Sequence, residues 1–460
     1  MAAMTTRQRV EPKQTPNPTP QENVPWAPIT VLGVIVAAAL PFNHTLPSAP
    51  RALWFVCVVA LICAPVLLMR AGRPLYPAVW AFAGFSSVVT ILVATKAATV
   101  DENLFVGSQL ALLVGVGPFA MTANVLVDPK FVQRVSVAFL AGQSVSAVTA
   151  ILQLLGRPVL GSEPLQGRAY GLAEHPNSLG YLACLAILIA LNMLLAKRRY
   201  QMPLFGALAA NIIALVASGS VGAMAALAMG LAVLMVSRRD QLGKMALGGV
   251  VCAIMLVLIG KLSGVFTYLP SVTGRYGQVM GQTESVSSWG LRTLTYEFAW
   301  RGISQEPIFG VGLSSKYSGT YNGITLIHNV FLRAWYQGGI LLAIAIALIV
   351  AAVLIVSLRG MIRKEDGGEI SVLVAIFAVA LTSALFEQRH FWLPVLVAWA
   401  SISAAAVKQK TAVLPPDHPG TEASTASLGR RHRSCSQEDR GQPQNLPRRY
   451  SRLRRLPTRR

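Results

Sequence analysis

The sequence lacks the residue patterns that several familiar chemistries require. Its 460 residues include five cysteines and no CxxC pair, so neither a disulfide framework nor a thiol redox site is expected. It also has no GxxxxGK(S/T) phosphate loop, no HExxH helix, no Cys/His cluster at metal-ligand spacing and no Asp-x-Asp pair. These absences argue against ATP, zinc and nucleotide-sugar chemistry. We therefore expect no metal site and no cofactor.

Charged residues are also scarce. They make up 13% of the chain, whereas hydrophobic residues make up 53% and the mean hydropathy is +0.53. Apolar runs of about 20 residues, the length that crosses a bilayer as a helix, recur along most of the sequence. Their length and their lack of polar alternation exclude an outer-membrane barrel. The composition predicts an all-α, polytopic membrane helix bundle.

About twelve transmembrane helices are expected, between a polar N-terminus (1–27), which shows no cleaved signal peptide, and a polar tail (408–460). The expected spans lie near residues 28–47, 52–69, 75–95, 104–126, 131–155, 172–195, 202–217, 220–236, 244–262, 326–357, 369–386 and 391–407. A long hydrophilic loop, residues 263–325, precedes the tenth span. Its aromatic residues indicate a folded cap, because a segment that buries apolar surface can offset the entropy of ordering.

The distribution of Lys and Arg predicts the orientation of the bundle. Alternate short loops carry thirteen of these residues, and the intervening short loops carry five. Because cytoplasmic loops retain positive charge, both termini are expected in the cytoplasm and the 263–325 loop outside the cytoplasmic membrane.

The tail from residue 408 has thirteen basic and four acidic residues. It has few apolar residues, so we expect it to be disordered. Two interpretations remain open: contact with anionic lipid of the inner leaflet, or a dispensable extension. Its one aromatic residue, Tyr450, gives little to stack on a base, so nucleic acid is not an expected partner.

Four arginines are expected on the outer side: Arg168, Arg275, Arg292 and Arg301. A guanidinium group suits diphosphate oxygens, because it stays charged and offers a planar fork of donors. Each arginine has an alternative role, as a helix cap, an ion-pair partner of a nearby glutamate or a contact to lipid headgroups.

Two histidines stand at the outer starts of spans. His328 is followed by Asn329, and a histidine there can accept a proton near neutral pH, which suits the activation of a sugar hydroxyl. The alternative is an interfacial residue that hydrogen-bonds a neighbour. His175 and Asn177 flank Pro176, and for them ordinary helix-start chemistry is the stronger interpretation.

Several short pieces follow one another over about residues 165–345. They are Arg168-Ala-Tyr-Gly171 with His175-Pro-Asn177, then Ser218-Gly-Ser220, then Arg292 with Pro307-Ile-Phe-Gly310-Val-Gly312, and His328-Asn-Val-Phe-Leu332 with Gly339. In this order they resemble the O-antigen ligase and Wzy-type O-antigen polymerase family of bacterial membrane glycosyltransferases. The expected span count and the large loop before His328 agree with that resemblance.

The resemblance implies a function in cell-envelope polysaccharide synthesis. In that family a glycan is transferred from a polyprenyl diphosphate to an acceptor sugar hydroxyl at the outer face of the bacterial cytoplasmic membrane, without a metal or a nucleotide. His328 then matches the proposed base. Arg292, with Arg275 as a second candidate, would hold the diphosphate.

One position departs from the family pattern. Many members have an arginine directly after the Ser-Gly-Ser element, where this chain has Val221. Either Arg275 or Arg168 takes the place of that arginine, or the chain is divergent or inactive.

Several functions stay open at this point. A polymerase would use a second lipid-linked repeat as acceptor, whereas a ligase would use a lipid, a protein or an envelope glycan. A solute transporter is an alternative of another class, although the expected span interiors hold almost no ionisable residues, which such proteins use along their pathway. A third alternative is a non-catalytic scaffold in an envelope-synthesis complex.

Overall fold

The structure of the protein is a computed structural model. It describes residues 27–68, 70, 72–94, 100–157, 167–196, 201–241, 243, 288–313, 320–322, 325–363, 367–383 and 388–413. The N-terminal segment 1–26, the ninth expected span, the loop segment 263–287 with Arg275, and the tail from residue 414 lie outside the described residues. One compact unit ends at Gln409, and residues from Lys410 belong to a second unit.

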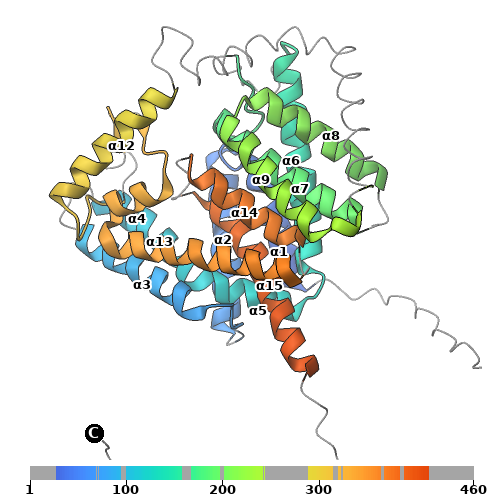
Figure 1. The fold of residues 1–460 in the computed structure, drawn as a ribbon, viewed down its shortest axis with the longest axis horizontal. Helices are drawn as coiled ribbons and strands as arrows, with labels where there is room; N and C mark the ends of the chain where they lie inside the picture. Colours follow the sequence, from blue (N-terminus) through green and yellow to red (C-terminus); the bar gives the residue numbers. More distant parts are fainter. Residues whose placement is uncertain are drawn as a thin grey trace, which may run out of the picture. The chain divides into compact units, whose positions relative to one another are not determined.

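Apolar helices form the first part of the chain (Figure 1). They are α1 (Pro28–Ala39), α2 (Ser48–Leu67), α3 (Pro77–Ala94), α4 (Val100–Leu110), α5 (Gly117–Val127), α6 (Phe131–Leu154), α7 (Pro176–Leu195), α8 (Gln201–Ser218) and α9 (Val221–Ser237). A 3-10 turn, Leu40–Phe42, extends α1, and a π-helical stretch, Ala111–Val116, joins α4 to α5. Another 3-10 turn, Arg239–Gln241, follows α9.

The second part begins with α12 (Ser288–Gln305) and two short strands, β1 (Thr320–Tyr321) and β2 (Thr325–Leu326). The strands pair antiparallel, with Thr320 opposite Leu326, and this ladder is the one departure from the expected all-α fold within the described residues. The helices α13 (Val330–Arg363), α14 (Gly367–Ala380) and α15 (Arg389–Val413) follow.

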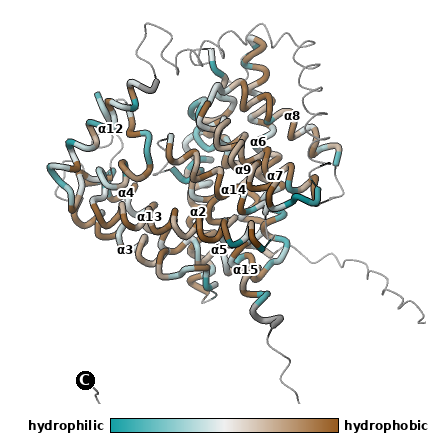
Figure 2. Tube along the Cα trace, viewed as in Figure 1, coloured by the Kyte–Doolittle hydropathy of each residue, from teal (hydrophilic) through white to brown (hydrophobic). Residues whose placement is uncertain are grey.

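Seven helices of the described residues are long and apolar enough to cross a membrane, and four shorter ones are also apolar. These eleven helices coincide with eleven of the twelve expected spans. Their surfaces agree with a lipid environment, because large apolar side chains such as Leu67 and Met202 are about four-fifths exposed (80% and 82%). Figure 2 shows hydrophobic residues along the helices and hydrophilic ones at many of their ends. The protein is therefore a polytopic membrane bundle.

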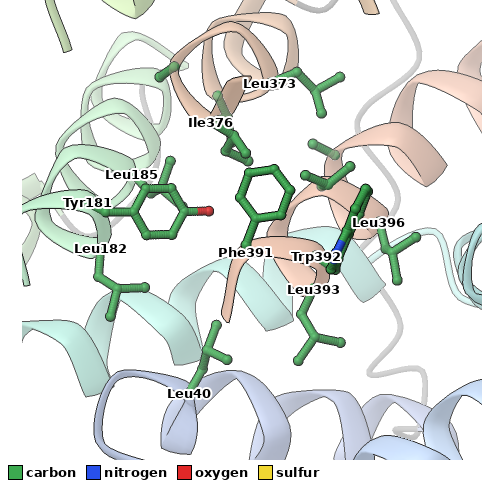
Figure 3. Close-up of a cluster of buried hydrophobic side chains, with 14 of the residues drawn as sticks. Leu40, Tyr181, Leu182, Leu185, Leu373, Ile376, Phe391, Trp392, Leu393 and Leu396 are labelled. Atoms are coloured by element: carbon green, nitrogen blue, oxygen red, sulfur yellow. The ribbon is translucent and has the colours of Figure 1, made fainter. Parts of the chain in front are cut away.

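The helices pack mainly in pairs: α9 against α14, α7 against α8, and α1 against α6. A central part of the core lies where α7, α14 and α15 meet, and Figure 3 shows Tyr181, Ile376 and Phe391 facing one another there. Trp392 and Trp399 of α15 are fully buried. Burial of such large rings supplies much of the packing contact that holds helices together in lipid.

Because successive helices run in opposite directions, the connections fall at two ends of the bundle. One end, here called the His328 end, carries the connections α1–α2, α6–α7 and α8–α9 and the starts of α13 and α15. At the opposite end, Asp128 accepts hydrogen bonds from Thr30 (2.6 Å) and Arg134 (2.7 Å). Arg359 there donates to the Tyr76 hydroxyl at 2.8 Å.

Candidate functional site

The site is built around a break in α13. Gly339 has φ 72° and ψ −172°, so the 34-residue helix is two helical segments that meet at this residue. That backbone conformation is essentially restricted to glycine. A Cβ atom at this position would also overlap the Ile308 carbonyl oxygen. The break separates a short first segment, which follows His328, from the long apolar stem of the helix.

The loop Pro307–Gly312 supplies the hydrogen bonds that the broken helix lacks. The Val311 and Gly312 amides donate to the carbonyls of Tyr336 and Gln337, both at 2.9 Å. In return, the Ile340 amide donates to the Pro307 carbonyl at 3.1 Å. Buried backbone groups need such partners, and most strictly in a membrane. The loop therefore fixes the direction in which the first segment of α13 points.

The helix α12 packs on this first segment through a small apolar core of its own. The buried members are Ala299, Ile303, Ile327 and Tyr336. Gly302 allows the close approach, because a Cβ atom there would overlap the Tyr336 ring. Figure 1 shows α12 running obliquely to α13 at its start. This packing brings one face of α12 to His328.

His328 is held by two hydrogen bonds beside that face. Its Nδ1 lies 2.6 Å from the Leu326 carbonyl oxygen, and its own carbonyl accepts from the Tyr296 hydroxyl at 3.1 Å. A carbonyl can only accept, so Nδ1 carries the proton in this geometry and Nε2 keeps its lone pair. The ring is thus oriented as a proton acceptor at Nε2.

Burial, the positive charge of Arg292 and, less strongly, that of Arg333 together lower the pKa of His328 to about 4, although the contact with the Leu326 carbonyl raises it. Arg292 is half-buried and precedes Tyr296 by four residues on α12, so both lie on one face of the helix. Arg333 lies one turn into α13, is only 1% exposed, and donates from Nε to Gln337 at 3.1 Å. The imidazole is therefore neutral at physiological pH and lies within electrostatic reach of two guanidinium groups.

Burial also raises the pKa of Tyr296, which Arg292 opposes, so the phenol stays protonated and remains a donor to His328.

Two other residues expected at this site have different positions. The Asn329 side-chain oxygen accepts the Phe331 and Leu332 amides, both at 3.0 Å, which is the role of a helix N-cap. Arg301 is exposed on α12 and has one weak ion pair, 3.9 Å to Glu297. The structure thus brings Arg292 to His328 but leaves Arg301 on the solvent-exposed face of α12.

Arg168, Asn177 and the Ser218-Gly219-Ser220 turn form a second group at the His328 end. Arg168 is 7% exposed. It donates from Nε to the Ser218 carbonyl and from a terminal nitrogen to the Asn177 side chain, both at 2.7 Å. His175 accepts the Asn177 amide at Nδ1 (3.1 Å) as the N-cap of α7, in agreement with the helix-start interpretation. Figure 1 shows α7 and α9, which flank this group, on the other side of α14 from α12.

Val221, the departure from the family pattern, opens α9 directly after this turn and is 40% exposed. The Arg168 guanidinium lies against the same turn: a Cβ atom on Gly219 would be 3.4 Å from Arg168 Nε. A cation is therefore present beside the Ser-Gly-Ser element, although it comes from another part of the chain.

Residues 206–347 match a family model described as O-antigen ligase. The chain carries an O-antigen ligase family domain. That domain includes the Ser218–Ser220 turn, Arg292, the Pro307–Gly312 loop, His328 and Gly339, on which the resemblance partly rested. The first piece of the resemblance, Arg168–Gly171 with His175–Asn177, lies before the matched residues. No curated protein matches the chain.

Sequence reasoning did not assign roles to several residues of the O-antigen ligase domain and its surroundings. Arg333 was visible as a charge near the start of an apolar span, which is an expensive place for an ionisable group. Tyr296 follows Arg292 at helical spacing. Gln153 of α6 accepts the Tyr170 and Gly171 amides (3.1 and 2.9 Å) and so holds the loop after Arg168. A buried glutamine in an apolar span was the available signal.

Proposed function

We propose that the protein is a glycosyltransferase that moves or polymerises a glycan from a polyprenyl-diphosphate donor onto a sugar hydroxyl. The O-antigen ligase family domain supports a role in polysaccharide assembly. The observation that carries the chemistry is His328, whose Nε2 is free to accept a proton and whose pKa is influenced by the charges of two arginines. The proposed orientation has both termini in the cytoplasm and the His328 end, with the 263–325 loop, outside.

In the proposed reaction His328 Nε2 takes the proton of the acceptor hydroxyl, and the hydroxyl oxygen attacks the anomeric carbon of the donor glycan. The bond between that carbon and the diphosphate oxygen breaks, and the polyprenyl diphosphate leaves with the electron pair. Arg292 stabilises the negative charge that develops on the leaving group. Attack opposite to the leaving group inverts the anomeric configuration. The proton on His328 then passes to solvent.

The low pKa of free His328 fits an enzyme that is activated by its donor. A neutral imidazole with a pKa near 4 is a weak base, and a nearby diphosphate anion would favour its protonated form. Donor binding is thus expected to raise the basicity of Nε2 when the acceptor arrives. Arg168, beside the Ser-Gly-Ser turn, is the candidate to supply the cation that Val221 does not.

The test is glycan transfer by purified protein in lipid nanodiscs, with a panel of polyprenyl-diphosphate oligosaccharides as donors. His328→Ala and Arg292→Ala are each expected to lose at least about a hundredfold in turnover. Arg157→Ala, an exposed arginine at the same end, is the matched control and is expected to retain activity. Variants that keep wild-type turnover would refute the assignment of these residues. A wild type that transfers no glycan from any donor would refute the proposed function.

A further inference from the structure

A separate group of ionisable side chains lies at the His328 end, at the starts of α2 and α15 and on the connections before α2 and α7. It consists of His44, Arg51, Glu174, Arg389 and His390, and is called here the second cationic cluster. His44 Nε2 lies 3.2 Å from Glu174 Oε2. The His44 and His390 rings meet edge to face, with centroids 6.1 Å apart. The one carboxylate of the cluster, Glu174, therefore contacts His44 and neither of the two arginines.

Neither arginine of this cluster has a carboxylate within ion-pair distance among the described residues, where the three ion pairs involve other cations. Arg51 donates to the backbone carbonyls of His44 (2.5 Å) and Leu46 (2.9 Å). Arg389 donates to Gln109 at 2.8 Å and stacks over the Phe55 ring at 4.7 Å. Burial lowers the pKa of His44 most, Glu174 opposes this, and both arginines lower it further. The cluster is therefore net positive, because its two arginines outnumber Glu174 while His44 is neutral.

Two buried polar atoms of the described residues close to this cluster have no hydrogen-bond partner. They are His390 Nε2, on a residue that is 3% exposed, and the hydroxyl of the fully buried Tyr181. The two rings have centroids 6.3 Å apart. Native proteins rarely leave such groups unpaired. A ligand with hydrogen-bonding oxygens held by the arginines of this cluster would supply the missing partners.

A cavity of about 360 Å³ begins about one helical turn from this cluster, at Leu40 and Leu393, and extends to Phe131 and Gly368 toward the opposite end of the bundle. It is lined mainly by α1, α6, α7, α14 and α15. On α15 the lining positions run from Leu393 to Lys408, and His390 precedes them on the same helical face, three residues before Leu393. At 1.5 Å per residue this distance is about 22 Å, which exceeds one leaflet of a hydrocarbon core of about 30 Å. The cavity is therefore long enough to hold a hydrocarbon chain that reaches past the middle of the bilayer, which is the property of a polyprenyl chain that the proposal uses.

We propose that the second cationic cluster and this cavity bind a second polyprenyl-linked phosphate, the lipid carrier of the acceptor glycan. The arginines hold the phosphate oxygens, and the polyprenyl chain occupies the cavity between α1 and α15. This inference rests on the proposed glycan transfer, in which Arg292 stabilises the diphosphate of the donor and His328 deprotonates the acceptor hydroxyl. It assigns the protein to polymerases that join two lipid-linked glycans, rather than to ligases.

Native mass spectrometry with long-chain polyprenyl diphosphate counts the bound lipids without any need for turnover. Wild type is expected to bind two. Arg389→Gln removes a charge-assisted hydrogen bond to the phosphate, and Ala398→Phe places a ring in the cavity. In each variant the second lipid is expected to bind at least about tenfold more weakly than in wild type. Arg157→Gln and Ala81→Phe, both exposed positions, are the matched controls and should bind two.

Arms with farnesyl diphosphate, inorganic diphosphate and phosphatidylglycerol distinguish the chain from the headgroup. Only the long polyprenyl diphosphate is expected to fill the second site. Equal occupancy by farnesyl diphosphate, inorganic diphosphate or phosphatidylglycerol overturns the assignment. Arg51→Gln tests the same cluster from an exposed position if Arg389→Gln does not fold. Glycan transfer by a protein that binds a single lipid would overturn this inference alone. Two bound lipids without any transfer would overturn the proposed function alone.

Discussion

The protonation of His328 can be predicted quantitatively and measured without a substrate. Its side chain is mostly buried and is repelled electrostatically, in its protonated form, by Arg292 and Arg333, so its pKa is lowered from 6.5 to about 4. In the unfolded chain the same imidazole binds a proton near pH 6.5. As pH falls below 6.5, the imidazole becomes protonated in the unfolded state but stays neutral in the folded state, so the free energy of unfolding decreases. Below pH 4 both states are protonated and the decrease stops.

The size of this effect follows from the difference between the two pKa values. At about 1.36 kcal/mol per pKa unit, the loss of stability reaches about 3 kcal/mol at pH 4 and about 2 kcal/mol at pH 5. The His328→Gln variant cannot gain this proton. It is therefore expected to lose less stability than wild type between pH 7.5 and pH 5, by about 2 kcal/mol.

The direct measurement is an NMR titration of ¹³C-labelled histidine in the detergent-solubilised protein. The chain has six histidines, and the spectrum of His328→Gln assigns the resonance. We expect a midpoint near pH 4, and a higher midpoint in Arg292→Gln, because the variant removes a charge that opposes protonation. A His328 midpoint at or above 6.5 would refute the argument from burial and charge. An unchanged midpoint in Arg292→Gln would refute the placement of that arginine.

Two further predictions concern stability. Gly339→Ala is expected to cost about 3 kcal/mol, because a side chain is strained at this φ and overlaps the Ile308 carbonyl. The control is Gly206→Ala, where open space surrounds the Cβ position; it should be neutral or stabilising by about 0.5–1 kcal/mol. Equal changes in melting temperature for the two variants would contradict the structural role of the break in α13. Burial alone would raise the pKa of Asp128, but hydrogen bonds from Thr30 and Lys130 and the charge of Arg134 outweigh it and lower that pKa. Asp128→Asn should lower the free energy of unfolding by about 2 kcal/mol at pH 7. The difference from wild type should shrink as acid protonates the wild-type carboxylate. A difference that does not change with pH would show that it does not come from the charge of Asp128.

The sequence was a good guide to the spans. Apolar length alone determines whether a helix can cross a bilayer, so hydropathy located the helices without any knowledge of their neighbours. The same pattern could not reveal the break in α13. Residues 326–357 read as one long apolar run, and a glycine within such a run has no signature that distinguishes flexibility from a left-handed backbone. Only the pairing of Gly339 with the Pro307–Gly312 loop defines it.

The candidate site was less visible for a similar reason. Helical spacing put Arg292 and Tyr296 on one face of α12, but which face meets His328 depends on the packing of Gly302 against Tyr336. Arg301 had the same chemical suitability as Arg292, and it lies on the exposed face. For His175, local chemistry was sufficient, because a cap is decided within one helical turn. Arg275 stays a candidate for the diphosphate site.

The two proposed lipid sites share a structural element, α4. At one point of this helix, Asn103 lies against Gly312, where a Cβ atom would be 3.0 Å from the Asn103 side-chain oxygen, and Gly312 is part of the loop that completes α13. Six residues later, Gln109 accepts the hydrogen bond from Arg389. Six residues of helix span about 9 Å, and a helix transmits position more faithfully than a loop. The proposed donor site and the proposed acceptor site thus both contact one rigid segment, so a shift of α4 would move both sites together. In the proposed reaction this arrangement would hold the two glycans at a fixed separation while one is transferred to the other.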